Sequence, residues 1–204
     1  MLSSQIAQFR GLIVVFSITA FLATGCTHTY KQPIHEVDLT SANNKIDMAV
    51  TLVITDDYRN AKWEEQTMTD TFVLPIGENL VHHTERLIQS VFVHSVVSDA
   101  ENKSFRNEKD VKYLLTPRVA YIEQSFGVTA FSKATTSIAV EWALTRTTGE
   151  PVWVETINGV GVGQPGNVFT AGGQQKRRFQ AALQDLFQKS QEAMLSSPLL
   201  RKLQ

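Results

Sequence analysis

The feature that most constrains the fold is a regular alternation of residues between Thr135 and Arg146. Large apolar side chains occupy every second position there, namely Ile138, Val140, Trp142 and Leu144. A period of two is that of a strand with one buried face. Thr147-Thr148-Gly149-Glu150 has the composition of a hairpin turn, and 152–162 has strand chemistry again. The sequence therefore predicts a long antiparallel hairpin.

Two other segments have the period of a helix that is apolar along one face. The first follows Gly77, and its stripe is Leu80, Thr84, Leu87, Ile88, Val91 and Phe92. The second spans about 174–195 and ends before Pro198, and its stripe is Phe179, Leu183, Leu186, Phe187, Ser190 and Met194. Both are predicted to pack their stripes on a sheet.

Four further segments complete the predicted order of elements. Strand chemistry marks 48–54, 69–75, 93–97 and 111–126. Glycines from Gly159 onward predict a loose or bulged stretch after the hairpin. The fold class that follows is α+β, a two-layer sandwich whose mostly antiparallel sheet carries two amphipathic helices on one face.

The N-terminus carries a different pattern. Residues 11–24 contain no charged side chain. This run is short for a membrane span, which needs about 20 apolar residues, but it fits the hydrophobic region of a signal peptide. It ends in Leu22-Ala23-Thr24-Gly25-Cys26, which includes the single cysteine of the chain. The alternative is a signal anchor followed by an incidental buried cysteine.

Leu22-Ala23-Thr24-Gly25-Cys26 resembles the lipobox of bacterial lipoproteins. The resemblance implies a diacylglyceryl group on the Cys26 sulfur, cleavage after Gly25 and acylation of the new amine. Thr27, in place of the aspartate that favours inner-membrane retention, implies the outer membrane. The expected organisation is a signal peptide (1–25), a lipidated cysteine and tether (26–45), and a single α+β domain facing the periplasm (46–204).

Composition excludes several classes of protein. Nineteen basic and twenty acidic residues give a formal charge of −1, so nothing favours nucleic acid, whose binding normally requires a positive excess. One cysteine permits neither an intrachain disulfide framework nor a metal site with several cysteines. We expect no cofactor other than the covalent lipid.

Candidate catalytic and metal sites have plainer explanations. His82, His83 and Glu85 suggest a metal site, but neighbouring helical residues point about 100° apart, and a solvated helix face is the alternative. No G-x-S-x-G motif is present, and the glycines from Gly159 to Gly163 lack the helix start that a dinucleotide fingerprint requires. The sequence predicts no catalytic residue, no metal ligand and no enzyme activity.

The order of elements resembles small outer-membrane lipoproteins of the YajG type and auxiliary lipoproteins of ABC-type envelope transport systems. Besides the lipobox, the residues that carry the resemblance are Tyr113-Leu114-Leu115, Ile138-Ala139-Val140-Glu141, Gly159-Val160-Gly161 and Ala181-Ala182-Leu183-Gln184-Asp185-Leu186. These families imply a binding or scaffold role and supply no catalytic residue.

Two features are candidates for partner binding. The connections 126–134 and 164–173 should emerge at one end of the sheet, and they carry Phe126, Phe131 and Phe169. Exposed aromatic residues often anchor a partner, although these side chains could instead cap the core. Lys176-Arg177-Arg178, the densest basic cluster, suggests an anionic lipid or an acidic partner, or else a solvated first helical turn.

The expected function is that of a non-enzymatic outer-membrane lipoprotein that binds another envelope protein as a binding or scaffold module. The alternative is a carrier of lipid or another hydrophobic ligand, attached to an ABC-type transport system. A cavity between the helices and the sheet would favour the carrier, and a filled core would favour the scaffold. The expected partners are the membrane, through the lipid anchor, and an envelope protein, and homo-oligomers are possible.

Overall fold

The computed structural model describes residues 26–29, 36–40, 44–66, 70–99, 112–125, 133–163 and 171–203. These residues belong to two compact units. The smaller contains 26–29, 62–66 and 70–75, and the larger contains the other described segments. The expected signal peptide (1–25) lies outside the described residues.

The smaller unit is a three-stranded sheet in the order β1 (Cys26–Thr29), β4 (Asp70–Pro75), β3 (Lys62–Gln66). β1 runs parallel to β4, and β3 runs antiparallel to it. The His28 ring stacks on Phe72 with centroids 5.5 Å apart, and its Nε2 lies 3.4 Å from Oδ1 of Asp70. The strand expected at 69–75 is therefore present, but it belongs to this separate sheet. β1 lies in the range that the sequence assigned to the tether.

The larger unit is built on a five-stranded sheet. Its order is β5 (Phe92–Asp99), β2 (Ile46–Ile54), β6 (Tyr113–Ser125), β7 (Thr135–Arg146), β8 (Pro151–Val162). β6, β7 and β8 form the expected antiparallel meander, whereas β2 is parallel to both β5 and β6. The sheet is thus mixed rather than purely antiparallel, and its antiparallel ladders are the longer ones. Parallel neighbours need a crossover, and α3 (Gly77–Val91) lies in the chain between β2 and β5.

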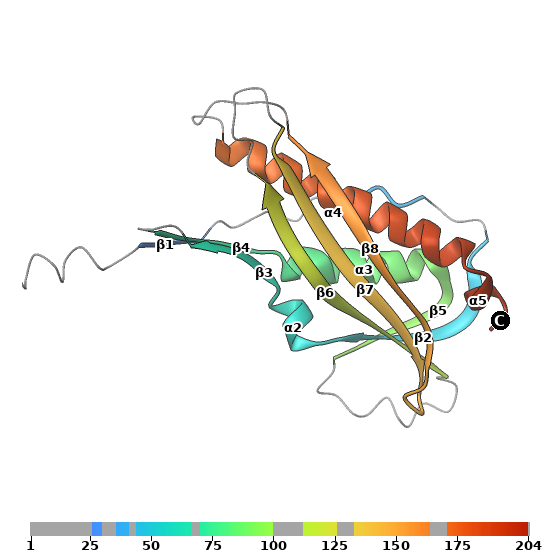
Figure 1. The fold of residues 1–204 in the computed structure, drawn as a ribbon. Helices are drawn as coiled ribbons and strands as arrows, with labels where there is room; N and C mark the ends of the chain where they lie inside the picture. Colours follow the sequence, from blue (N-terminus) through green and yellow to red (C-terminus); the bar gives the residue numbers. More distant parts are fainter. Residues whose placement is uncertain are drawn as a thin grey trace, which may run out of the picture. The chain divides into compact units, whose positions relative to one another are not determined.

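The α+β class with two helices on one face of the sheet is confirmed. α3 and α4 (Ala171–Ser196) lie side by side across one face of the five-stranded sheet (Figure 1). Every residue of the two predicted stripes is buried. Pro198 follows the end of α4, as expected, and opens the short helix α5 (Pro198–Arg201), whose N-cap is Ser197.

The β7–β8 hairpin supplies much of the core of this unit. Its alternation is confirmed, because Ile138, Val140, Trp142 and Leu144 are fully buried. The hairpin turn contains Gly149 at φ 93°, a conformation that favours glycine.

A second short helix, α2 (Asp56–Arg59), places Tyr58 in the core, where its hydroxyl lies 2.7 Å from Oγ1 of Thr84 on α3. Burial raises the pKa of Tyr58 above its ordinary value.

Gly159 and Gly161 correct one expectation. They do not loosen the chain but continue β8, paired with Ile138 and Thr136 of β7. A Cβ at Gly159 would overlap the carbonyl oxygen of Ala182, and one at Gly161 would overlap that of Arg178. Both carbonyls belong to α4, so these glycines permit the close approach of helix and strand.

Candidate interaction surface

The two connections that the sequence proposed for binding begin at the same end of the five-stranded sheet. Ser125 at the end of β6 pairs with Thr135 at the start of β7, and Thr135 pairs with Val162 at the end of β8. The chain therefore leaves β6 and β8 and enters β7 at the same end of the sheet. The expected placement of the two connections follows from this register. Phe126, Phe131 and Phe169 themselves lie outside the described residues.

The basic cluster Lys176-Arg177-Arg178 is partly exposed to solvent and partly buried. Lys176 and Arg177 are exposed, whereas Arg178 is 6% exposed and lies where a Cβ on Gly163 would meet it. Burial lowers the pKa of Arg178. Within this cluster, Lys176 and Arg177 thus offer their side chains to an anionic partner, near the end of the sheet where β8 finishes.

The space between α4 and the sheet is filled by side chains. The indole Nε1 of Trp142 on β7 donates a hydrogen bond of 3.0 Å to Oγ of Ser190 on α4. The rings of Trp142 and Phe187 meet edge to face with centroids 6.4 Å apart. Where β8 passes under α4, the glycines bring the backbones into direct contact. This packing leaves no room there for a hydrophobic ligand.

Two depressions lie on the surface of the helical layer instead. The larger, about 630 Å³, is lined mainly by polar side chains of α4 together with Thr40 and Arg201. The smaller, about 380 Å³, lies between α4 and β8. Both open widely to solvent. A lipid pocket is a cleft or cavity that buries most of its ligand, so neither of these open depressions fits a lipid.

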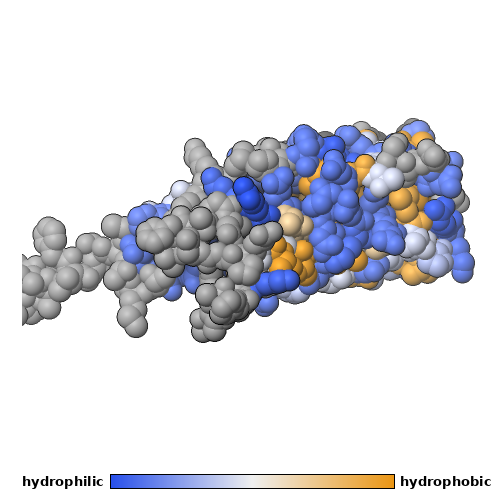
Figure 2. All heavy atoms as spheres, turned by 90° about the horizontal axis from the view of Figure 1, so that it is seen from above, coloured by the Kyte–Doolittle hydropathy of each residue, from blue (hydrophilic) through white to orange (hydrophobic). Residues whose placement is uncertain are grey.

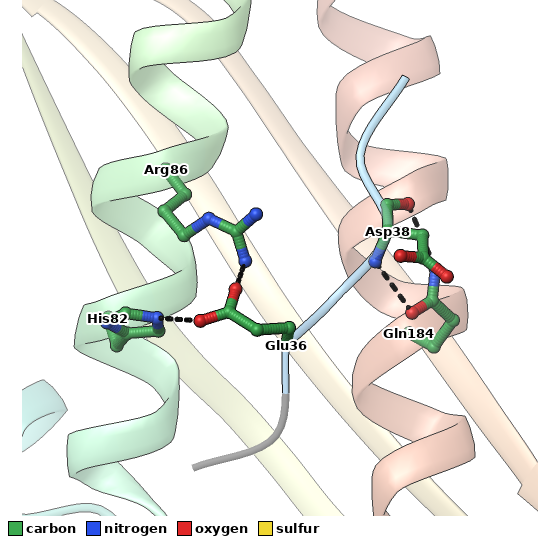
Figure 3. A network of polar contacts seen from close by, with 5 residues as sticks. All are labelled: Glu36, Asp38, His82, Arg86 and Gln184. Carbon is green, nitrogen blue, oxygen red and sulfur yellow. Dashed lines mark hydrogen bonds and ion pairs between the residues drawn. The ribbon is translucent and has the colours of Figure 1, made fainter. Parts of the chain in front are cut away.

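A segment that the sequence assigned to the tether is docked on the helices. Residues 36–40 run between α3 and α4, and Val37 is 2% exposed (Figure 3). Glu36 forms an ion pair with Arg86 of α3, and its carboxylate also lies beside the His82 ring. We call residues 36–40 the strap.

Glutamine side chains of α4 hold the strap by its backbone. The Gln184 amide accepts from the Asp38 N–H and donates to the Asp38 carbonyl, both at 3.0 Å. Gln191 makes the same pair of bonds with Thr40, at 3.0 and 2.8 Å, and donates to Oγ of Ser90 on α3 at 2.8 Å. Gln188 also donates to the Asp38 carbonyl, at 3.2 Å. The sequence analysis did not predict this site. The pattern that could have indicated it is the spacing of Gln184, Gln188 and Gln191 at i, i+4 and i+7 on one helix.

The two histidines on α3 have different surroundings: His82 lies beside the strap, and His83 packs in the core. His82 faces Glu36 with Nε2 3.5 Å from Oε1, whereas His83 is fully buried with its ring 5.4 Å from that of Phe187. The two rings therefore do not converge on one metal. Within the described part of the chain, no group of three His, Cys, Asp or Glu side chains is placed to hold a metal ion.

The face of the sheet opposite the helices carries polar and apolar side chains together. Val154, Val160, Val162 and Tyr121 are exposed there, beside an ion pair between Arg118 and Glu141 at 3.1 Å. Figure 2, turned by 90° from the view of Figure 1, shows hydrophobic areas separated by hydrophilic ones on the side seen from above. None of the described helices is both long and apolar enough to cross a membrane.

Comparison of the sequence with protein-family models and with curated proteins found no match. Solved structures do match. Protein XCC0632 from Xanthomonas campestris, described with the family model DUF330, has a TM-score of 0.53 at 10% identity, over 83% of this chain and 94% of its own. A minor lipoprotein from Acinetobacter baumannii has a TM-score of 0.47 at 12% identity, over 75% and 94%.

A third match is a protein from Caulobacter crescentus CB15 described as a putative lipoprotein, with a TM-score of 0.37 at 16% identity over 56% of this chain and 78% of its own. Of the three, the Xanthomonas protein alone exceeds a TM-score of 0.5. At 10% identity this similarity shows that the two proteins share a fold.

Proposed function

We propose that this chain is a lipid-anchored protein of the bacterial outer membrane that faces the periplasm and acts as a binding or scaffold module. The anchor is supported by the uncharged run 11–24 and by the position of Cys26, the single cysteine, directly after it. Two or more acyl chains on one residue would hold the protein firmly, since each buried CH₂ contributes about 0.8 kcal/mol.

The filled space between α4 and the sheet is the observation that favours a scaffold over a carrier. A carrier needs an enclosed apolar volume for its ligand. Here that space is taken by Trp142, Phe187 and the contact of Gly159 and Gly161 with α4. Binding must therefore use the outer surface.

We place the partner at the end of the sheet where β6 and β8 finish. The connections that carry Phe126, Phe131 and Phe169 begin there, and exposed Lys176 and Arg177 lie on the first turns of α4. Loops on a rigid sheet often carry function, and aromatic and basic side chains together fit a protein partner with an acidic rim.

The anchor is tested by Cys26→Ser in cells fed a clickable fatty acid. The wild-type protein should be labelled and partition with the membrane. The variant should lose the label, because no other thiol is present. Normal labelling of Cys26→Ser would contradict the lipoprotein proposal.

The binding site is tested by Phe131→Ala and Phe169→Ala, with crosslinking in intact cells and mass spectrometry of the captured proteins. Both variants should unfold at the wild-type temperature and lose the partner. Gln180→Ala, on an exposed position of α4, is the matched control and should keep it. Loss of stability with the partner retained would show that these rings cap the core instead.

A further inference from the structure

The strap makes the same kind of contacts with α4 that one β-strand makes with another. In an antiparallel ladder, a hydrogen-bonded residue pairs through both its N–H and its C=O. Asp38 does this with the side-chain amide of Gln184, and Thr40 does it with that of Gln191. Residues two apart in an extended chain present these groups on the same side. The two glutamines therefore bind an extended backbone as the edge of a sheet would.

Gln191 is held in this orientation by a residue outside the strap. Its Nε2 donates to Oγ of Ser90 on α3 at 2.8 Å, and that hydroxyl donates to the Leu87 carbonyl at 2.7 Å. Neither of these two bonds involves the strap. The side chain that receives the backbone is therefore positioned by α3, and such preorganisation lowers the free-energy cost of binding.

The contacts define which kind of segment the site accepts. Glu36 pairs with Arg86 of α3 (Figure 3), so the first position favours an acidic side chain. Val37 is 2% exposed, so the second favours a small apolar one. Asp38 and Thr40 keep their side chains exposed and bind through backbone groups, which every residue except proline supplies in full. Recognition thus depends on two side chains and otherwise on an extended backbone.

We infer that this surface of α3 and α4 is a binding site for an extended segment of a partner protein, with an acidic residue followed by a small apolar one, and that the strap occupies it as an intramolecular competitor. A segment tethered by a short linker competes at an effective concentration in roughly the millimolar range. A free peptide should therefore bind the intact protein weakly and a protein with a weakened strap more tightly. This inference does not rest on the proposed lipid anchor or on the partner site at the end of the sheet.

The experiment measures binding of a fluorescein-labelled peptide of residues 34–42 to the full-length protein in detergent, by fluorescence anisotropy. Glu36→Arg in the protein, at an exposed position, replaces attraction to Arg86 by repulsion and weakens the strap without a change in the core. This variant should keep its circular dichroism spectrum and bind the peptide roughly tenfold more tightly than the wild type, because the competent fraction rises. Glu150→Arg, in the exposed β7–β8 turn, is the matched control and should bind like the wild type.

Changes in the peptide test the recognition itself. Asp38→Pro removes the N–H that donates to Gln184, and Val37→Asp places a charge at the buried position, so each should abolish binding to the Glu36→Arg protein. Asp38→Ala keeps the N–H and should bind like the parent peptide. Equal binding by the wild type and Glu36→Arg, no binding by either protein, or equal binding of the Asp38→Pro and Asp38→Ala peptides would each overturn the inference.

Sedimentation of the same proteins tests a different occupant, the strap of a second copy. If the strap is a competitor within its own chain, the wild type and Glu36→Arg should have the same oligomeric state. A wild-type dimer that Glu36→Arg dissociates would place the strap of a second copy in the site and overturn the assignment to a partner protein.

Discussion

Replacement of Gly159 or Gly161 by alanine tests whether these residues serve close packing or flexibility. At both positions the nearest atoms to a new Cβ belong to the backbone or Cβ of α4 and would lie closer than 3.0 Å. The helix would have to move away from β8, taking with it the buried Phe179, Leu183 and Leu186.

We expect the added methyl group to lower the free energy of unfolding by more than its size suggests. Overpacking of a filled core costs about 1–3 kcal/mol, whereas replacing glycine by alanine restricts the unfolded chain and returns only about 0.4–1 kcal/mol. A net loss of about 2 kcal/mol would lower the melting temperature of a domain of this size by roughly 4–8 °C. Thermal unfolding followed by circular dichroism measures this directly.

Gly163→Ala is the matched control. Its Cβ would meet side-chain atoms of Arg178 rather than the backbone of α4, so the Arg178 side chain would have to move while the helix could stay in place. We therefore expect Gly163→Ala to lower stability less than Gly159→Ala and Gly161→Ala, because a side chain adjusts more readily than a helix backbone. If Gly159→Ala and Gly161→Ala are as stable as the wild type, or if all three variants behave alike, the proposed contact between α4 and β8 is refuted.

Three further predictions concern the core and the strap. Leu186→Ala should lower stability by about 2–5 kcal/mol because the side chain is fully buried; an unchanged melting temperature would mean that α4 is not docked. Gln191→Ala should speed hydrogen exchange at the Thr40 amide, which loses its acceptor, and unaltered exchange would contradict the strap contacts. Tyr58→Phe should cost about 1–2 kcal/mol, since the hydroxyl bonds to buried Thr84. Because burial raises the pKa of Tyr58, stability should be fully present below the ordinary value of about 10 and should fall above it; Tyr58→Phe should weaken this fall in alkaline urea titrations.

Periodicity was enough to predict the elements that bury one face. The alternation in β7 and the stripes of α3 and α4 follow from local spacing, and the structure buries all of them. The parallel pairing of β2 with β5 and β6 was not predictable in this way. Alternation shows which face of a strand is buried but does not identify its neighbour.

The features that the sequence did not predict depend on contacts between distant residues. Gly159 and Gly161 have turn-like composition, and only the position of α4 explains them. The strap joins Asp38 and Thr40 to α4 across about 150 residues of sequence, through backbone groups that every residue possesses. The signal for such a site lies in the glutamines alone, and these are also ordinary residues of a solvated helix face.

The strap also couples the two helices of the larger unit. Glu36 pairs with Arg86 of α3, and the backbone of Asp38 and Thr40 bonds to Gln184 and Gln191 of α4. A shift of one helix along the other would therefore have to break contacts with the strap as well as contacts in the core. Because the bonds to α4 are made by backbone groups, which every residue possesses, they constrain the sequence of the helix more than the sequence of the strap.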